Sequence, residues 1–369
     1  MFKFLTLTLF ILFTTISPSA ACSQQDLTAL LSFKNSFPPN SISNSWTTAI
    51  DCCSWDYIQC DETSGRVTTL SISDNRNLRG PIPPSIGDLS ALQVVSFSNL
   101  PGLIGPIPPQ LSKLKALQFL TMYKTKVSGP VPSFLSTFTG LRELELAESN
   151  FVGTIPSSLG NLVNLSFIDL SGNQLTGAIP DSLFSKLTGS LADLDVSDNT
   201  LKGPIPKSFG RVRFANVNLG SNQLDGDASF LFGESKTVSQ VILSKNKFAF
   251  DLTNVKYPQN LQYLDISHNK IYGSISNQIT NLTNFGYLDV SYNELCGRIP
   301  SGGSFLLCRE SASELEVEAS LHFLHFGAIR PNGSGASVDE WEVGGGLRIH
   351  LVVVVAVMKG EDGGLVVKG

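Results

Sequence analysis

The sequence predicts an α/β solenoid, and the evidence is a repeated phrase, the length of its period and the residue type at its turn. The skeleton Leu-x-x-Leu-x-Leu-x-x-Asn-x-Leu-x-Gly-x-Ile-Pro returns every 23 to 26 residues through the middle of the 369-residue chain. We therefore expect ten stacked units of about 24 residues with one concave parallel β-sheet. The units begin at Val67, Leu92, Leu117, Leu141, Leu165, Leu191, Phe214, Val238, Leu261 and Phe285, and the last ends near Gly303.

Each unit is a leucine-rich repeat whose strand follows from the alternation of its side chains. In the fifth unit the strand is expected at residues 166–171. Ile168 and Leu170 should point into the core, because neighbouring side chains of a strand face opposite sides. Phe167 and Asp169 should then face outward. A single unit cannot bury its leucines alone, so the core is continuous along the stack.

An asparagine follows most of the predicted strands. Its amide can donate to and accept from backbone groups of the turn, so stacked copies should form a ladder. Thr125 and Ser149 replace it in two units, where we expect a weaker ladder. The asparagines are Asn75, Asn173, Asn199, Asn222, Asn246, Asn269 and Asn293. Farther along the fifth unit, Gly177 suits a tight bend and Pro180 ends strand pairing.

Residues 1–21 are predicted to be a secretory signal peptide. Lys3 is followed by an apolar run from Phe4 to Phe13, and Ser19 and Ala21 are small residues before the expected cleavage point. The run is too short for a membrane-spanning helix, and no later apolar segment reaches that length, so the protein is not expected to span a membrane. We expect a secreted, extracellular protein.

Residues 22–66 are predicted to form an N-terminal cap. Residues 26–33 have helical spacing, with Asp26 in a capping position. Trp46 and Trp55 are expected in the core, covering the open end of the first repeat. Residues 304–369 lack the period altogether and are predicted to be an atypical tail, disordered or aberrant.

Six cysteines fit disulfides in an oxidising compartment. Four of them, Cys22, Cys52, Cys53 and Cys60, lie in the cap and allow three pairings. The adjacent pair would be strained as a disulfide, which favours bonds from Cys52 and Cys53 to Cys22 and Cys60 in some order. A zinc site is the weaker alternative, since no histidine is near and the usual spacing is missing.

The net charge of −5 and the lack of a basic run argue against nucleic-acid binding. The sequons at Asn164 and Asn281 are predicted glycosylation sites on a secreted chain, and a third at Asn332 lies in the tail.

The outward strand positions predict a binding face rich in acids. Carboxylates from Glu143 to Asp198 line successive repeats, so their fields add and favour a basic partner. Tyr123, Tyr263 and Tyr287 are candidate rigid anchors. An ordinary role is the competing interpretation, because Asp in Leu-Asp-Leu-Ser is common in such repeats and aids solubility. The candidate partner-binding residues are Tyr123, Lys124, Glu143, Glu145, Glu148, Phe167, Asp169, Asp193, Asp195, Asp198, Asn218, Gln240, Lys245, Tyr263, Asp265, His268, Tyr287 and Asp289.

The sequence indicates a binding protein and not an enzyme. It has no nucleophile elbow, no metal-spaced histidine pair and no phosphate loop, so no cofactor or metal is expected. Asp193 and Asp195 could suggest a glycosidase, but a flat concave sheet offers no closed pocket to raise the pKa of one acid.

Residues 22–303 resemble the plant polygalacturonase-inhibiting proteins, which are secreted leucine-rich-repeat inhibitors of pectin-degrading enzymes. The stretches that carry the resemblance are 51–55 with Cys60 after them, 224–229, 268–275 and 290–300. The resemblance implies a right-handed superhelix with disulfide-bonded caps, located in the cell wall. It also implies the pairs Cys22–Cys52 and Cys53–Cys60, and contact between the concave face and the enzyme near its active cleft.

The resemblance stops near Gly303. The family's C-terminal cap is built on four cysteines, and here Cys296 matches the first while the context of Cys308 does not match. An incomplete cap would expose sheet edge and apolar surface, which favours aggregation.

The leading hypothesis is therefore a monomeric inhibitor of fungal or insect polygalacturonase in plant defence. The alternative is a soluble leucine-rich-repeat recognition module that binds a receptor or peptide. An ice-binding relative would need a flat array of Asn and Thr, whereas the outward positions here are acidic and aromatic. Pectin is a minor candidate ligand, because no basic cluster is evident.

Overall fold

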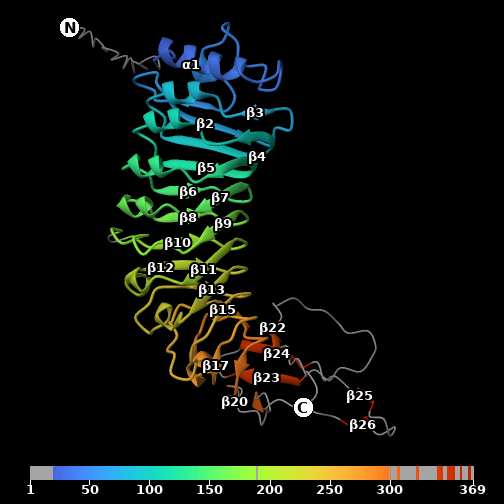
Figure 1. Ribbon diagram of the computed structural model, residues 1–369. Coiled ribbons are helices and arrows are strands. Elements are labelled where there is room, and N and C mark those ends of the chain that lie inside the picture. Colours follow the sequence, from blue (N-terminus) through green and yellow to red (C-terminus); the bar gives the residue numbers. More distant parts are fainter. Residues whose placement is uncertain are drawn as a thin grey trace, which may run out of the picture.

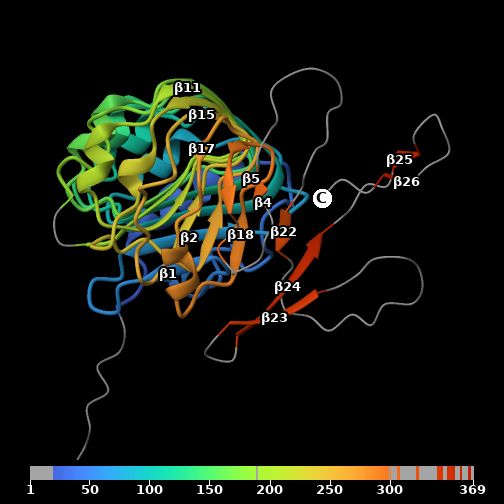
Figure 2. The ribbon, with the colours of Figure 1, turned by 90° about the horizontal axis from the view of Figure 1, so that it is seen from below.

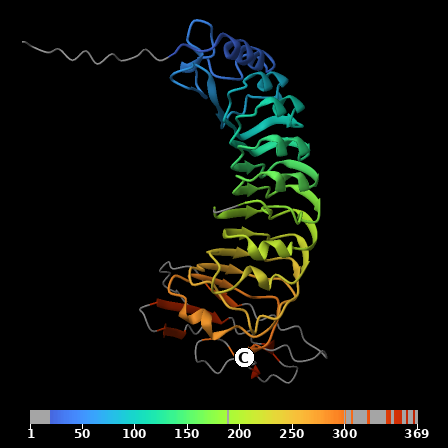
Figure 3. The ribbon, with the colours of Figure 1, turned by 90° about the vertical axis from the view of Figure 1, so that its left-hand side faces the viewer.

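The computed structural model is a curved stack of repeats, which confirms the predicted solenoid (Figure 1). It describes residues 20–187, 190–298 and 300, together with short strands farther along the chain. The parallel sheet lies along the inner side of the curve (Figure 3). Viewed along the stack, the repeats overlie one another, with β2 and β18 on one side and β11, β15 and β17 on another (Figure 2). The predicted signal peptide lies almost wholly outside the described residues.

Each predicted repeat contributes one strand to the concave sheet, and all of these strands pair in parallel. The fifth strand shows the predicted alternation, because Ile168 is fully buried while Phe167 and Asp169 are half-buried. The strands are β2 (Val67–Ser73), β4 (Val94–Gly105), β5 (Phe119–Pro130), β6 (Glu143–Glu145), β8 (Phe167–Asp169), β10 (Ala192–Asp195), β12 (Phe214–Asn218), β14 (Gln240–Ile242), β16 (Tyr263–Asp265) and β18 (Tyr287–Asp289).

Short strands and 3-10 helices return the chain from one concave strand to the next. The strands are β3 (Gly80–Pro81), β7 (Asn150–Thr154), β9 (Gln174–Gly177), β11 (Thr200–Pro204), β13 (Gln223–Gly226), β15 (Lys247–Phe248), β17 (Tyr272–Gly273) and β19 (Glu294–Leu295). The 3-10 helices are η2 (Pro84–Asp88), η3 (Pro109–Lys113), η4 (Ser133–Thr137), η5 (Ser157–Asn161), η6 (Lys207–Arg211), η7 (Ser229–Leu231) and η8 (Asn277–Asn281). Five of them begin after the proline of an Ile-Pro or Val-Pro pair, and proline presets φ and does not need a backbone donor.

The predicted asparagine ladder is present. Asn173 donates from Nδ2 to Leu146 O at 2.7 Å and accepts the Phe151 N–H at 2.9 Å, so one amide joins two repeats. The pattern recurs from Asn199 to Asn293. Asn75 differs because no repeat precedes it, and its Nδ2 donates to Ser41 O of the cap at 2.7 Å. Hydroxyls replace the amides at Thr125 and Ser149, whose oxygens lie 2.9 Å apart.

The residue just before each ladder position is in the left-handed region. We call these positions the turn column: Asp74, Asn99, Lys124, Glu148, Gly172, Asp198, Ser221, Lys245, His268 and Tyr292, with φ between 46° and 62°. This conformation is sterically unfavourable for non-glycine residues. The conformation keeps the turn paired along the stack, since the Lys245 N–H donates to Ser267 O at 3.0 Å and equivalent bonds recur.

The cap contains α1 (Gln24–Asn35), η1 (Cys52–Ser54) and β1 (Ile58–Cys60), and β1 pairs antiparallel with β2. The predicted helix is confirmed, but the predicted capping role of Asp26 is wrong. Ser23 is the N-cap residue, whereas Asp26 is fully buried and bonded to Arg66 and the Val67 N–H. Trp46 and Trp55 are in the core as expected, with ring centroids 5.1 Å apart.

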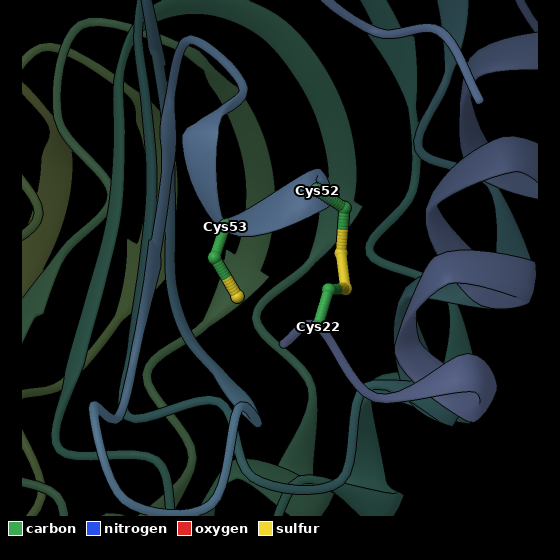
Figure 4. Close-up of side chains that lie close together, drawn as sticks. All are labelled: Cys22, Cys52 and Cys53. Atoms are coloured by element: carbon green, nitrogen blue, oxygen red, sulfur yellow. A yellow bond between two sulfur atoms is a disulfide. The ribbon is translucent and has the colours of Figure 1, made fainter. Parts of the chain in front are cut away.

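The disulfides Cys22–Cys52 and Cys53–Cys60 are the pairs that the resemblance implied. Figure 4 shows the first of these bonds with Cys53 beside it. The sulfurs of Cys22, Cys52 and Cys53 lie within 4.8 Å of one another. All three are in disulfides, so they offer no thiolate to zinc, and the alternative of a zinc site is not supported.

At the far end of the sheet β18 pairs antiparallel with β22 (Leu321–Phe323). The remaining strands are β20 (Gly297–Arg298), β21 (Leu306–Leu307), β23 (Asp339–Val343), β24 (Leu347–Val353), β25 (Met358–Lys359) and β26 (Leu365–Val366). Most of residues 304–369, the sequon at Asn332 included, lies outside the described residues, so our expectation for the tail remains a prediction.

Candidate partner-binding face

The outward side chains of the concave sheet form two rows in register. The strand-start row is Thr69, Val94, Phe119, Glu143, Phe167, Asp193, Asn216, Gln240, Tyr263 and Tyr287. The strand-end row is Ser71, Ser96, Thr121, Glu145, Asp169, Asp195, Asn218, Ile242, Asp265 and Asp289. The turn column borders the second row. Tyr123 lies on β5 between that row and Lys124, so all eighteen candidate residues named from the sequence lie on this one face.

Glu145 and Asp169 are neighbours in the strand-end row, and both side chains are half-buried. Burial, aided by the adjacent carboxylates, raises the pKa of both residues above the usual range. Asp169 accepts the N–H and hydroxyl of Ser171 at 2.9 and 2.6 Å, which only partly offsets the burial. Adjacent strands lie about 4.8 Å apart, so the two carboxylates repel each other. A cation arriving at this point would relieve that repulsion.

The acids of β10 are already hydrogen-bonded within the face. Asn216 donates to Asp193 at 2.6 Å, and Asn218 donates to Asp195 at 2.8 Å. Asp195 also accepts the N–H and hydroxyl of Ser197. Asp193 and Asp195 therefore also bind side chains of the face itself.

Tyr123, Lys124 and Glu148 form a closed cluster at the other end of the acidic stretch. Lys124 Nζ lies 4.8 Å from the centre of the Tyr123 ring and 3.5 Å from Glu148 Oε1. The Tyr123 hydroxyl donates to the same oxygen at 3.1 Å. These contacts raise the pKa of Lys124, with the Tyr123 hydrogen bond as the leading cause. The charge of Glu148 is thus partly compensated.

Two aromatic stacks lie on the last two repeats. The rings of Tyr263 and Tyr287 are 4.1 Å apart and nearly parallel, at 3°. His268 and Tyr292, in the turn column, stack at 4.0 Å. Asp265 and Asp289 each bond the serine two residues later, and Asp289 is only 8% exposed, so little of its carboxylate faces outward.

The predicted glycosylation sites are away from this face. Asn164 is exposed after η5, with its Nδ2 donating to Thr139 O at 3.0 Å, and Asn281 is the exposed last residue of η8. Neither site is on a concave strand.

A shallow polar hollow of about 440 Å³ lies between the cap and the first repeat, with Asn40, Tyr57, Asp74 and Arg76 among its lining residues. It contains none of the candidate residues. The concave face itself is an open sheet, a shape that suits a macromolecular partner better than a small molecule.

Three features of the face were missed by the sequence reasoning. The turn column is one, although a glycine in one of its ten positions, Gly172, was a visible signal. The bonds from Asn216 and Asn218 to the preceding repeat are another, because register between repeats is needed to see them. The third is Leu100, which replaces the ladder asparagine in the second repeat and is fully buried.

Comparison with family models supports both parts of the fold. A model described as the leucine rich repeat N-terminal domain matches residues 23–61. A leucine rich repeat model matches residues 140–162, 164–185 and 260–282. In the described part of the chain, no helix has the length and apolar character needed to cross a bilayer.

Similar proteins cover most of the chain. A polygalacturonase inhibitor of Pyrus communis is 45% identical over 282 residues, which is 76% of this chain and 84% of that protein. The leucine-rich repeat protein FLOR 1 of Arabidopsis thaliana is 45% identical over 283 residues, 76% of this chain and 86% of that protein. Among solved structures, a plant ice-binding protein superposes with a TM-score of 0.74 at 42% identity, covering 77% of this chain and 91% of that one.

Proposed function

Because this chain belongs to the polygalacturonase-inhibitor family of leucine-rich-repeat proteins, we propose that it binds polygalacturonases through its concave face and blocks their substrate cleft. The observation that carries the proposal is the in-register pair Glu145 and Asp169 within a longer acidic stretch, on a face long enough for a protein partner. A basic enzyme surface is the complement of such a face.

In this proposal the protein inhibits the enzyme by occupying its substrate cleft. A polygalacturonase must hold an anionic polymer, and lysines and arginines are the side chains suited to that task. Carboxylates of the concave face compete for these cations and keep the polymer out. No bond is made or broken, so the inhibitor acts as a binding protein, with no enzymatic activity, cofactor or metal of its own.

We propose that the protein acts outside the cell, in the plant cell wall. Two disulfides in the cap support an oxidising compartment. There it acts as a monomer, glycosylated at Asn164 and Asn281. Binding to pectin is a minor part of the proposal.

The test is reducing-sugar release from polygalacturonic acid by a panel of fungal and insect polygalacturonases with the full secreted chain added. We expect dose-dependent inhibition of at least one enzyme. The double variant Glu145→Lys, Asp169→Lys tests the role of the acidic pair. It should lose inhibition while its circular-dichroism spectrum stays that of the wild type. Lack of inhibition across the panel by a folded wild-type chain would contradict the proposal.

The second candidate is a soluble recognition module for a receptor or peptide. The observation in its favour is the equal identity to FLOR 1, whose name states no enzyme target. A folded chain that inhibits no polygalacturonase, yet retains a plant extracellular protein on an affinity column only when its concave face is unaltered, would favour this candidate.

A further inference from the structure

The concave face changes character between β10 and β12. On β6, β8 and β10 the two rows carry Glu143, Glu145, Phe167, Asp169, Asp193 and Asp195, and we call this part the acidic half. On β12 to β18 they carry Asn216, Asn218, Gln240, Ile242, Tyr263, Asp265, Tyr287 and Asp289, the amide–aromatic half. The first half is almost fully charged, and the second is mainly neutral.

Within the acidic half, the field facing solvent is strongest at β6 and β8. The β10 acids are bonded to the asparagines of β12, so their charge is directed partly along the sheet. Among the bonds of the described residues, Glu145 and Asp169 accept none from the repeat that follows, and Glu145 has a hydrogen bond from Thr121 of the repeat before it. Burial, together with the neighbouring carboxylates, raises the pKa of both residues. A long-range field without a fixed partner acts mainly on the rate of encounter.

The amide–aromatic half is preorganised for short-range contact. Tyr263 and Tyr287 are stacked at 4.1 Å before any partner arrives, so docking against them costs little side-chain entropy. This half has two carboxylates in its rows, Asp265 and Asp289, against five in the acidic half, so its net field is weaker. Rigid aromatic side chains are the usual source of slow dissociation in protein interfaces.

We infer that the two halves have separate kinetic roles in one docking event: the acidic half steers a basic protein surface onto the face, and the amide–aromatic half retains it. The inference rests on the proposed function and adds the chemistry of the partner. That partner has a basic patch opposite β6 and β8 and a neutral hydrogen-bonding patch opposite β16 and β18. The facing edges of the two patches, opposite β8 and β16, are four strand spacings apart, or roughly 19 Å.

The experiment measures association and dissociation rates by biolayer interferometry, at two salt concentrations, with a polygalacturonase that the full chain inhibits. The double variant Glu145→Gln, Asp169→Asn should slow association about tenfold and reduce its salt dependence, with dissociation changed less than about threefold. Tyr263→Leu should do the opposite, accelerating dissociation about tenfold with little change in association. A matched control, Asp88→Asn with Asp227→Asn, removes the same charge from outside the concave rows and should change neither rate.

A peptide arm separates this inference from the proposed function. A fluorescent tetra-arginine peptide should bind the full chain more tightly than it binds the Glu145→Gln, Asp169→Asn variant. It should bind the Asp88→Asn, Asp227→Asn control as tightly as the full chain. Circular dichroism first establishes that each variant is folded. If no polygalacturonase is inhibited but the peptide keeps this preference, the proposed function fails and the steering role stands. Equal peptide binding to all three proteins, or a Tyr263→Leu variant that only associates more slowly, would overturn the inference.

Discussion

Arg66 and Asp26 join the N-terminal cap to the first repeat through a two-point ion pair whose carboxylate is fully buried. Arg66 Nε lies 2.8 Å from Asp26 Oδ2, and Nη2 lies 3.1 Å from Oδ1. The Val67 N–H donates to the same carboxylate at 2.9 Å. One side chain of α1 thus fixes both the arginine and the start of β2.

Replacing Asp26 with alanine should lower the free energy of unfolding by about 2 to 4 kcal/mol, because it leaves the Val67 N–H unpaired in the core and removes a buried ion pair. Urea unfolding followed by circular dichroism checks this. Asp88→Asn is the matched control, since the Asp88–Lys113 pair is exposed on both sides and should contribute about 0 to 1 kcal/mol. Equal effects of the two variants would show that the buried pair does not hold the cap.

Gly172→Ala should destabilise the protein by about 1 to 2 kcal/mol, since an L-residue is disfavoured at this φ of +62°. Its Cβ would also lie 3.2 Å from the Glu148 Cα and Cγ. The control is Gly286→Ala, whose Cβ meets nothing nearer than 3.8 Å and which should be neutral or stabilising by up to about 1 kcal/mol. Thermal unfolding of both variants measures the difference. A Gly172→Ala variant more stable than the wild type would show that residue 172 does not have a left-handed backbone conformation.

Stability should depend on pH through Glu145 and Asp169. The pKa of each is raised in the folded protein, so the folded state binds protons more readily and these groups lower stability as pH rises through their folded pKa. The variant Glu145→Gln, Asp169→Asn should therefore be more stable than the wild type at pH 7, by about 0.2 to 1 kcal/mol per like-charge contact. The difference should disappear below about pH 4, the unfolded pKa range. Denaturant midpoints at pH 3.5 and 7 test this, and a constant difference would argue against titration as the cause.

Tyr257→Phe should leave stability unchanged or raise it by about 1 kcal/mol. The Tyr257 side chain is fully buried against Phe232, and its hydroxyl has no hydrogen-bond partner in the structure. Removing a buried, unpaired hydroxyl removes its desolvation cost. Differential scanning calorimetry provides the measurement. A loss above about 1 kcal/mol would mean that the hydroxyl is hydrogen-bonded in solution.

The strands of the repeats could be predicted from the sequence because the alternation of side chains within each repeat shows which residues face the core. The position of Ile168 and Asp169 follows from alternation alone, and the ladder follows from the chemistry of one amide. Relations between repeats were harder to predict. Asn216 meets Asp193 only because β10 and β12 pair in a particular register. The role of Asp26 was misjudged for a similar reason, since its partner Arg66 lies 40 residues away.

The turn column has a consequence for how the face can change over generations. Its backbone is held by bonds between repeats, and nine of its ten positions carry a non-glycine residue despite the steric cost of this conformation. The residues found are Asp, Asn, Lys, Glu, Gly, Ser, His and Tyr, and none is β-branched. Charge, size and aromaticity can therefore be exchanged along this edge while the frame stays the same. Substitutions in the turn column therefore change the binding face one repeat at a time while the backbone of the repeats is kept.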